Sequence, residues 1–118
     1  MLRFLAAGFG KRLKDWGKTM ITFIRSASIA PGKTGDAIAF ANQIGKHIKE
    51  NYGITVELLM PVGGNPNRIA WHAHYESLAQ LEALAAKLLA DTEYMGTIAK
   101  HSATWLPGSV HDEIWRTI

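Results

Sequence analysis

Cysteine is absent from this 118-residue sequence, and charged side chains are sparse at 19%. Without a thiol the chain can form no disulfide, no thiolate nucleophile and no zinc–thiolate site. The absence fits a cytoplasmic protein, because structural disulfides belong to oxidising compartments. Long apolar runs are also missing, and none approaches the ~20 residues that a helix needs to cross a bilayer. We therefore expect a cytoplasmic protein without disulfides.

What the sequence does contain is typical of a globular domain. Apolar residues make up 47% of the chain, which is too many for a disordered segment. The length suits one domain of ordinary size. A chain of this length can bury a core of its own, although a core shared in a dimer would strengthen it.

The net charge of +3 is concentrated at the N-terminus. Residues 1–19 carry five basic side chains and one acidic side chain, a local charge of +4. Residues 20–118 carry eight basic and nine acidic side chains, a local charge of −1. A nucleic-acid-binding domain carries its basic face on the folded body. The distribution therefore argues against nucleic acid as a partner.

Residues 1–19, MLRFLAAGFGKRLKDWGKT, form a basic amphipathic extension before the domain expected over 20–118. Apolar residues recur at spacings of three and four, as on one side of a helix. Three interpretations stay open: a helix that packs on the domain or its partner, an extension upstream of a start at Met20, and a membrane-surface or targeting helix. Three glycines weaken any helix by ~1 kcal/mol each, and no signal-peptide cleavage pattern follows. Membrane contact is therefore the least favoured of the three.

Two periodicities alternate along residues 20–118. Runs with period two and many β-branched residues predict strands, and apolar spacings of three and four predict helices. The expected strands cover 20–30, 54–61, 68–76 and 110–118, and the expected helical segments cover 31–53, 77–91 and 92–103. The expected helix caps are Thr34 or Asp36, Ser77 with Gln80, and Asp91, and Gly53 is expected to end the first helix.

The order of these elements predicts an α+β, ferredoxin-like βαββαβ fold. In this arrangement two helices cover one face of an antiparallel sheet. The other face must be covered by something else or stay in water. A second copy of the chain is the economical cover, so we expect a homodimer formed through the open sheet face.

Three segments carry a resemblance to a known superfamily. They are IAPGKTGDAIAFA at 29–41, WHAHYESLAQLEAL at 71–84 and PGSVHDEIWRTI at 107–118. With them, residues 20–118 resemble the dimeric α/β-barrel superfamily, in particular its NIPSNAP-like and antibiotic-biosynthesis-monooxygenase-like small domains. The resemblance implies two protomers packed sheet against sheet around a barrel-like cavity.

Activities in this superfamily include cofactor-free oxygenases, haem-degrading enzymes and isomerases. The resemblance therefore implies a homodimer that binds a small organic ligand, with monooxygenase-like chemistry that needs no cofactor as one expectation. Haem-degrading members use an asparagine on the first strand, and residues 20–30 contain none. A non-catalytic dimeric module, structural or regulatory, is the alternative.

His72 and His74 lie two residues apart on the third expected strand, so both point to the same face. The more apolar residues of that strand should meet the helices, which leaves both histidines on the open face. By the same alternation we expect Arg25 and Glu57 to join them. Trp71, Tyr75 and Trp105 are further candidates for ligand contact, although packing in the core explains them as well.

This grouping allows three interpretations, and all three stay open. Polar residues could simply pair with one another at the dimer seam, for example Arg25 with Glu57. Alternatively a histidine could act as a general base and Arg25 could stabilise the resulting anion. A metal site would require two imidazoles and Glu57 on one ion. The sequence favours structural pairing first and a metal least, so we expect no metal.

Overall fold

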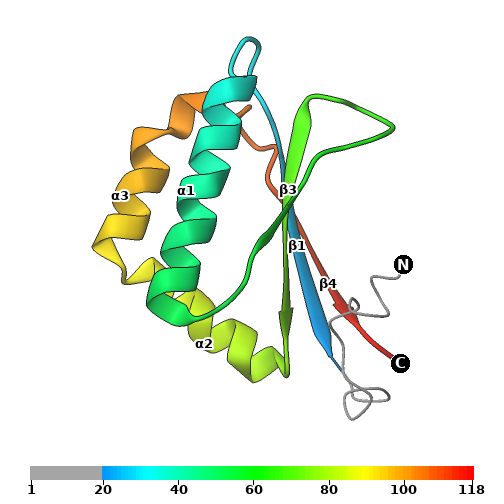
Figure 1. Ribbon diagram of the computed structural model, residues 1–118, viewed down its shortest axis with the longest axis vertical. Coiled ribbons are helices and arrows are strands. Elements are labelled where there is room, and N and C mark those ends of the chain that lie inside the picture. Colours follow the sequence, from blue (N-terminus) through cyan, green and yellow to red (C-terminus); the bar gives the residue numbers. More distant parts are fainter. Residues whose placement is uncertain (1–19) are drawn as a thin grey trace.

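The computed structural model describes residues 20–118, which fold into a four-stranded antiparallel sheet with helices on one face (Figure 1). The strands are β1 (Ile21–Ser28), β2 (Glu57–Leu59), β3 (Arg68–Tyr75) and β4 (His111–Arg116), in the spatial order β2-β3-β1-β4. The helices are α1 (Thr34–Tyr52), α2 (Leu78–Leu89) and α3 (Thr92–Lys100), followed by the 3₁₀ turn η2 (Ser102–Thr104). This is the predicted ferredoxin-like fold. The extension predicted at 1–19 lies outside the described residues.

The starts of α2 and α3 follow the predicted capping. Ser77 accepts a hydrogen bond from the backbone N–H of Gln80 at 3.1 Å. Asp91 accepts one from the backbone N–H of Tyr94 at 3.0 Å. Each bond satisfies an amide that has no partner within its own helix. These two caps fix the points at which the chain enters α2 and then α3.

Helix α1 ends as predicted but starts differently. Gly53 has a left-handed φ of 73°, and its N–H bonds to the carbonyl of Lys49 at 3.0 Å. Glycine adopts this conformation without the steric cost that a Cβ would add. The predicted caps Thr34 and Asp36 are wrong, because both already lie inside the first helical turn. Lys33 occupies the capping position, and no side chain caps the helix there.

All four strands are shorter than predicted: β1 covers Ile21–Ser28 of the predicted 20–30, and β3 covers Arg68–Tyr75 of the predicted 68–76. Strand β2 covers only Glu57–Leu59 of the predicted 54–61, and β4 covers His111–Arg116 of the predicted 110–118. Both are edge strands, each hydrogen-bonded to one neighbour. The length of such a strand depends on where its partner ends, which the apolar pattern does not reveal.

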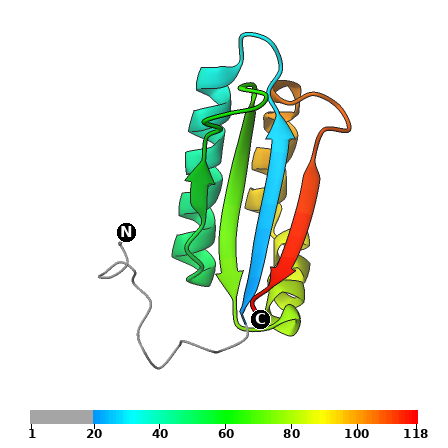
Figure 2. The same ribbon diagram turned by 90° about the vertical axis from the view of Figure 1, so that its right-hand side faces the viewer.

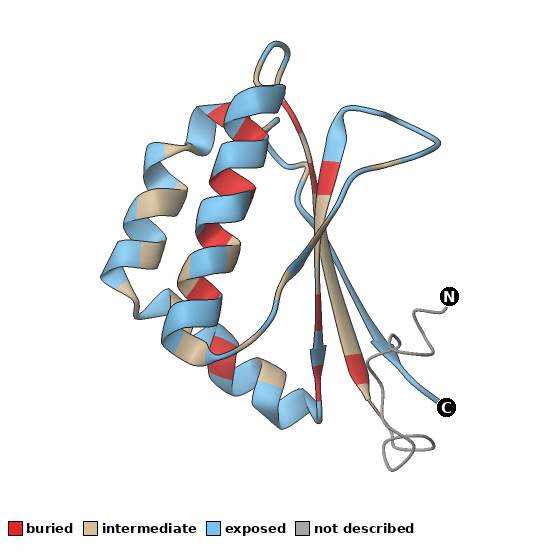
Figure 3. Cartoon of the chain, viewed as in Figure 1, coloured by how far each residue is buried: buried red, intermediate tan, exposed pale blue. Residues whose placement is uncertain are grey.

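The core lies between α1 and the sheet (Figure 3). One cluster of buried residues contains Ile21, Phe40, Ile44, Ile48, Ala73, Tyr75 and Leu84, and a second contains Ile29, Ala37, Ala41 and Ile69. The buried residues of α1 follow the helical spacing of three and four. No helix in residues 20–118 combines the length and apolarity that crossing a membrane requires.

Strand pairing decides which side chains share a face, because residues directly opposite each other point to the same side. In β1, Ile21 pairs with Tyr75 and Ala27 pairs with Ile69, all of them core residues. Odd-numbered residues of β1 and β3 therefore face the helices, and even-numbered residues face away from them. Figure 2 shows that no helix or strand of residues 20–118 covers this second face, since the helices lie behind the sheet. We call it the open face.

Candidate functional site

Four cross-strand rows make up the open face, and the fourth contains Ser28 and Arg68. The first row contains Trp115, Thr22 and His74. The second contains Glu113, Ile24, His72 and Glu57, and the third contains His111, Ser26, Ala70 and Leu59. Two of its apolar side chains are prominent, since Trp115 is 60% exposed and Leu59 is 43% exposed. The face therefore combines apolar surface with a group of polar side chains, as ligand-binding walls do.

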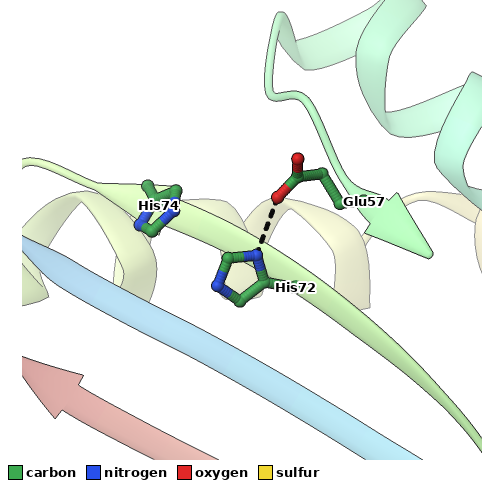
Figure 4. Close-up of side chains that lie close together, drawn as sticks. All are labelled: Glu57, His72 and His74. Atoms are coloured by element: carbon green, nitrogen blue, oxygen red, sulfur yellow. Dashed lines mark hydrogen bonds and ion pairs between the residues drawn. The ribbon is translucent and has the colours of Figure 1, made fainter. Parts of the chain in front are cut away.

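Glu57, His72 and His74 form the polar group of greatest chemical interest, and we call them the trio. Glu57 lies directly opposite His72 in the β2–β3 pair. Its Oε1 is 2.9 Å from His72 Nδ1 (Figure 4). An ionised carboxylate can only accept a hydrogen bond, so Nδ1 carries the proton. In the neutral imidazole, Nε2 is then the nitrogen that can accept a proton.

His74 follows His72 on the same face of β3. The small residue between them, Ala73, points to the core on the other face. The two rings lie 4.6 Å apart between centroids and are nearly perpendicular, at 84°. Thr22 Oγ1 and His74 Nδ1 lie within hydrogen-bond distance at 3.1 Å. One donor atom from each member of the trio can be chosen so that all three lie within 4.8 Å of one another. The predicted meeting of both histidines with Glu57 is confirmed.

The expected placement of Arg25 beside the histidines is wrong. Arg25 lies opposite Trp71 in the β1–β3 pair, so it faces the helices. Its Nε and Nη2 donate to the two carboxylate oxygens of Asp112 at 2.7 and 2.8 Å. This hydrogen-bonded pairing raises the pKa of Arg25 and lowers the pKa of Asp112. A cavity lined jointly by Arg25 and the histidines is excluded, because the sheet separates them.

Three aromatic candidates, Trp71, Tyr75 and Trp105, also lie on the helix side of the sheet. Tyr75 belongs to the buried core. The rings of Trp71 and Trp105 lie 5.5 Å apart, and both rings contact Phe40. The indole N–H of Trp71 is buried without a hydrogen-bond partner in residues 20–118. Packing thus accounts for the position of all three rings, and none of them lies on the open face with the trio.

Sequence reasoning missed a second polar cluster, which joins α1 to the start of α3. Asp91 Oδ2 accepts a hydrogen bond from the hydroxyl of Tyr52 at 2.6 Å and lies 2.7 Å from His47 Nε2. The hydrogen bonds from Tyr52, from the Tyr94 amide and from His47 lower the pKa of Asp91 well below its usual range. The capping pattern revealed Asp91, but its side-chain partners lie about forty residues earlier.

Known structures share this architecture, although no protein-family model and no curated protein matches the chain. A NIPSNAP family protein of unknown function from Agrobacterium tumefaciens is 20% identical, with a TM-score of 0.72 over 86% of this chain and 90% of its own. An uncharacterised NIPSNAP-like domain protein from Burkholderia xenovorans is 18% identical, with a TM-score of 0.72 over 84% and 85%. A candidate antibiotic biosynthesis monooxygenase from Nitrosomonas europaea is 16% identical, with a TM-score of 0.65 over 84% and 90%.

These likenesses confirm the resemblance inferred from the sequence at the level of fold. The chain has the ferredoxin-like architecture of NIPSNAP-like domains. Identities of 20% or less establish a fold and not an activity, since one fold carries many functions. The function must therefore be argued from the side chains of the open face.

Proposed function

We propose that two copies of the chain associate through their open faces and bind a small organic ligand between the sheets, beside the trio. The observation that carries this proposal is the pairing of Glu57 with His72 on a sheet face that no helix or strand of residues 20–118 covers. The carboxylate orients the ring and leaves its second nitrogen directed away from Glu57 (Figure 4). An oriented imidazole on a partly apolar wall is suited to bind an acidic ligand.

The exposed apolar surface supports the second copy as the cover of the open face. A tryptophan that is 60% exposed on a sheet face marks an interaction surface more often than free surface. Four strands spaced ~4.8 Å apart, with eight residues in β1, give a face of about 19 Å by about 26 Å. Two such faces cover on the order of 1,000 Å², close to the ~1,200–2,000 Å² of stable interfaces.

The shape of the single chain also supports a ligand compartment that needs the second copy. Two hollows of about 420 and 430 Å³ lie in the described part of the chain. The first adjoins the loop between β1 and α1, and the second lies between α1 and α3. Neither of these two hollows borders the trio. In this proposal a partner sheet supplies the missing wall of a compartment at the trio.

The finer proposal is cofactor-free, monooxygenase-like chemistry that begins with proton removal. His72 Nε2 takes a proton from an activated aromatic or enolic ligand, and Glu57 stabilises the resulting imidazolium through its hydrogen bond to Nδ1. The fold shared with a candidate antibiotic biosynthesis monooxygenase supports this reaction class. Arg25 has no part in it, because it lies on the other side of the sheet.

Ligand titration tests this proposal with a naphthol and an enolic 1,3-diketone as probes. We expect His72→Ala to weaken binding of the better probe about five- to tenfold, the effect of losing one hydrogen bond of ~1 kcal/mol. His111→Ala is the matched control, because His111 lies on the same face but on the edge strand β4, in a different row from each member of the trio. Equal affinities for wild type and His72→Ala would contradict the assigned role.

The second candidate function is a non-catalytic dimeric module, structural or regulatory. One observation favours it: the polar side chains of the open face are already paired within the chain. His72 pairs with Glu57, and the indole N–H of Trp115 donates to Glu113 at 2.9 Å. If the chain is such a module, neither probe binds to the wild type or to any variant. His72→Ala then changes only the dissociation constant of the dimer.

A further inference from the structure

The three donor groups of the trio converge in a way that proton transfer alone does not require. We propose that Glu57, His72 and His74 bind one divalent transition-metal ion of the zinc type, through one atom of each side chain. Cation binding by the trio goes beyond the proposed function, because it needs neither an organic ligand nor a second copy of the chain.

The distances between the donor atoms are close to those of a tetrahedral zinc site. Zinc binds nitrogen and oxygen at ~2.0–2.2 Å, which places neighbouring ligand atoms about 3.4 Å apart. His72 Nδ1 and Glu57 Oε1 are separated by 2.9 Å. The full set lies within 4.8 Å, so closing on an ion requires a shift of at most about 1.4 Å. Rotation of surface side chains about their χ angles provides shifts of this size.

The backbone supplies the template for this arrangement. His72 and His74 alternate with Ala73, so their Cβ atoms leave the same face of β3. Glu57 is held opposite His72 by the β2–β3 pairing. Ligands on paired strands are positioned more firmly than ligands on loops, which lowers the entropic cost of binding the ion. Figure 4 shows Glu57 reaching from β2 towards His72, with His74 further along β3.

Charge and surrounding contacts also suit a cation. Arg68 is the only lysine or arginine in the four rows of the open face; it lies two rows from His72, and its Nε donates to the carbonyl of Asn65 at 3.4 Å. The row of Glu57 and the rows beside it therefore hold no fixed positive charge. Thr22 Oγ1 lies 3.1 Å from His74 Nδ1, which is the position of an outer contact that orients a ligating ring.

The donor set indicates the class of metal. Two imidazoles and one carboxylate suit zinc, copper(II), nickel or cobalt, whereas magnesium and calcium require oxygen donors. Three protein ligands leave the fourth tetrahedral position for water or for an anionic oxygen, as in catalytic zinc sites. If the compartment of the proposed function forms, a carboxylate, phenolate or enolate ligand takes that position. Only this last statement rests on the proposed function.

Zinc titration of the untagged, EDTA-treated full-length protein tests the inference, with calorimetry for affinity and visible absorption of cobalt(II) for geometry. We expect one tight equivalent per chain and the intense absorption of tetrahedral cobalt. His72→Ala, His74→Ala and Glu57→Gln should each weaken zinc binding at least tenfold, and His111→Ala should leave it within about twofold. Circular dichroism of each variant verifies that it is folded, and Glu57→Gln keeps the size of the side chain.

Two results would overturn the site: a wild-type protein that takes up no zinc, or a control variant that loses as much affinity as the trio variants. Either result leaves the proposed function standing. That function is measured without metal, by the affinity for organic probes and by the dissociation constant of the dimer. Conversely, a protein that binds zinc as a monomer retains the metal site and loses the shared compartment.

Discussion

Replacement of Trp115 by alanine should weaken the homodimer strongly if the open face is its interface. A tryptophan side chain has about 250 Å² of surface, so 60% exposure leaves about 150 Å² available to a partner. Truncation removes about 100 Å² of apolar surface per copy and about 200 Å² per twofold interface. At ~25 cal/mol per Å², the loss in the free energy of dimerisation is about 5 kcal/mol.

Relaxation around the truncated site lowers this figure, and alanine substitutions at central interface residues cost ~2–4 kcal/mol. We therefore expect a dissociation constant raised between about thirtyfold and about a thousandfold. Sedimentation velocity over a range of protein concentrations measures it. Leu89→Ala is the matched control, because Leu89 is 73% exposed on α2, on the opposite side of the sheet.

Three outcomes would refute this reasoning. A wild-type chain that sediments as a monomer at every concentration removes the dimer altogether. Equal effects of Trp115→Ala and Leu89→Ala place the interface elsewhere or make it non-specific. A dimer unaffected by Trp115→Ala shows that the copies meet through another surface, and the trio then faces solvent.

Two further predictions concern the folded chain. Hydrogen bonds from Tyr52, the Tyr94 amide and His47 lower the pKa of folded Asp91, so the stabilisation they provide is complete above about pH 4 and is lost as the pH falls further. Asp91→Asn should therefore flatten the acid limb of stability, and urea unfolding between pH 2.5 and 7 would show parallel curves if the idea is wrong. Phe40→Ala should cost about 3–5 kcal/mol of unfolding free energy, because Phe40 is 4% exposed in the core, while Ile38→Ala at 39% exposure should cost less than about 1 kcal/mol. Similar losses in the two variants would contradict the described packing.

The proton-accepting role of His72 Nε2 depends on the hydrogen bond from Nδ1 to Glu57 Oε1, and the metal-binding role uses these same two atoms, Nδ1 and Oε1. An ion bound between Nδ1 and Oε1 takes the place of the hydrogen that now bridges them at 2.9 Å. The two roles therefore exclude each other at any one moment. Zinc added to the probe titration should change the affinity for the organic ligand, and His111→Ala should respond as wild type does.

Local features of this protein were predictable because they depend on residues close together in the chain. Ser77 and Asp91 cap their helices, and Gly53 ends α1, since each contact spans only a few residues. The failures at the start of α1 and at the ends of β2 are of a different kind. They depend on backbone pairings that a capping pattern or an apolar run does not encode.

The trio was predictable for a related reason. In β3 the apolar set is unambiguous, so alternation alone places His72 and His74 on the open face. Glu57 follows, because Leu58 beside it belongs to the apolar side. Strand β1 has no such contrast, because Arg25 stands among apolar residues on the same side as Phe23 and Ala27. The side of a mixed strand therefore could not be read from its own residues.

The sequence alone determined the order of strands and helices, the ferredoxin-like fold and the common direction of the two histidines, since these follow from periodicities of two and 3.6 residues. Only the tertiary structure decided that Arg25 meets Asp112, 87 residues away, and that Asp91 joins α1 to α3. The physical reason is that strand register and helix packing bring together side chains whose separation along the chain carries no signal. The tertiary structure therefore decides whether the charge of Arg25 lies beside the imidazoles or on the other side of the sheet.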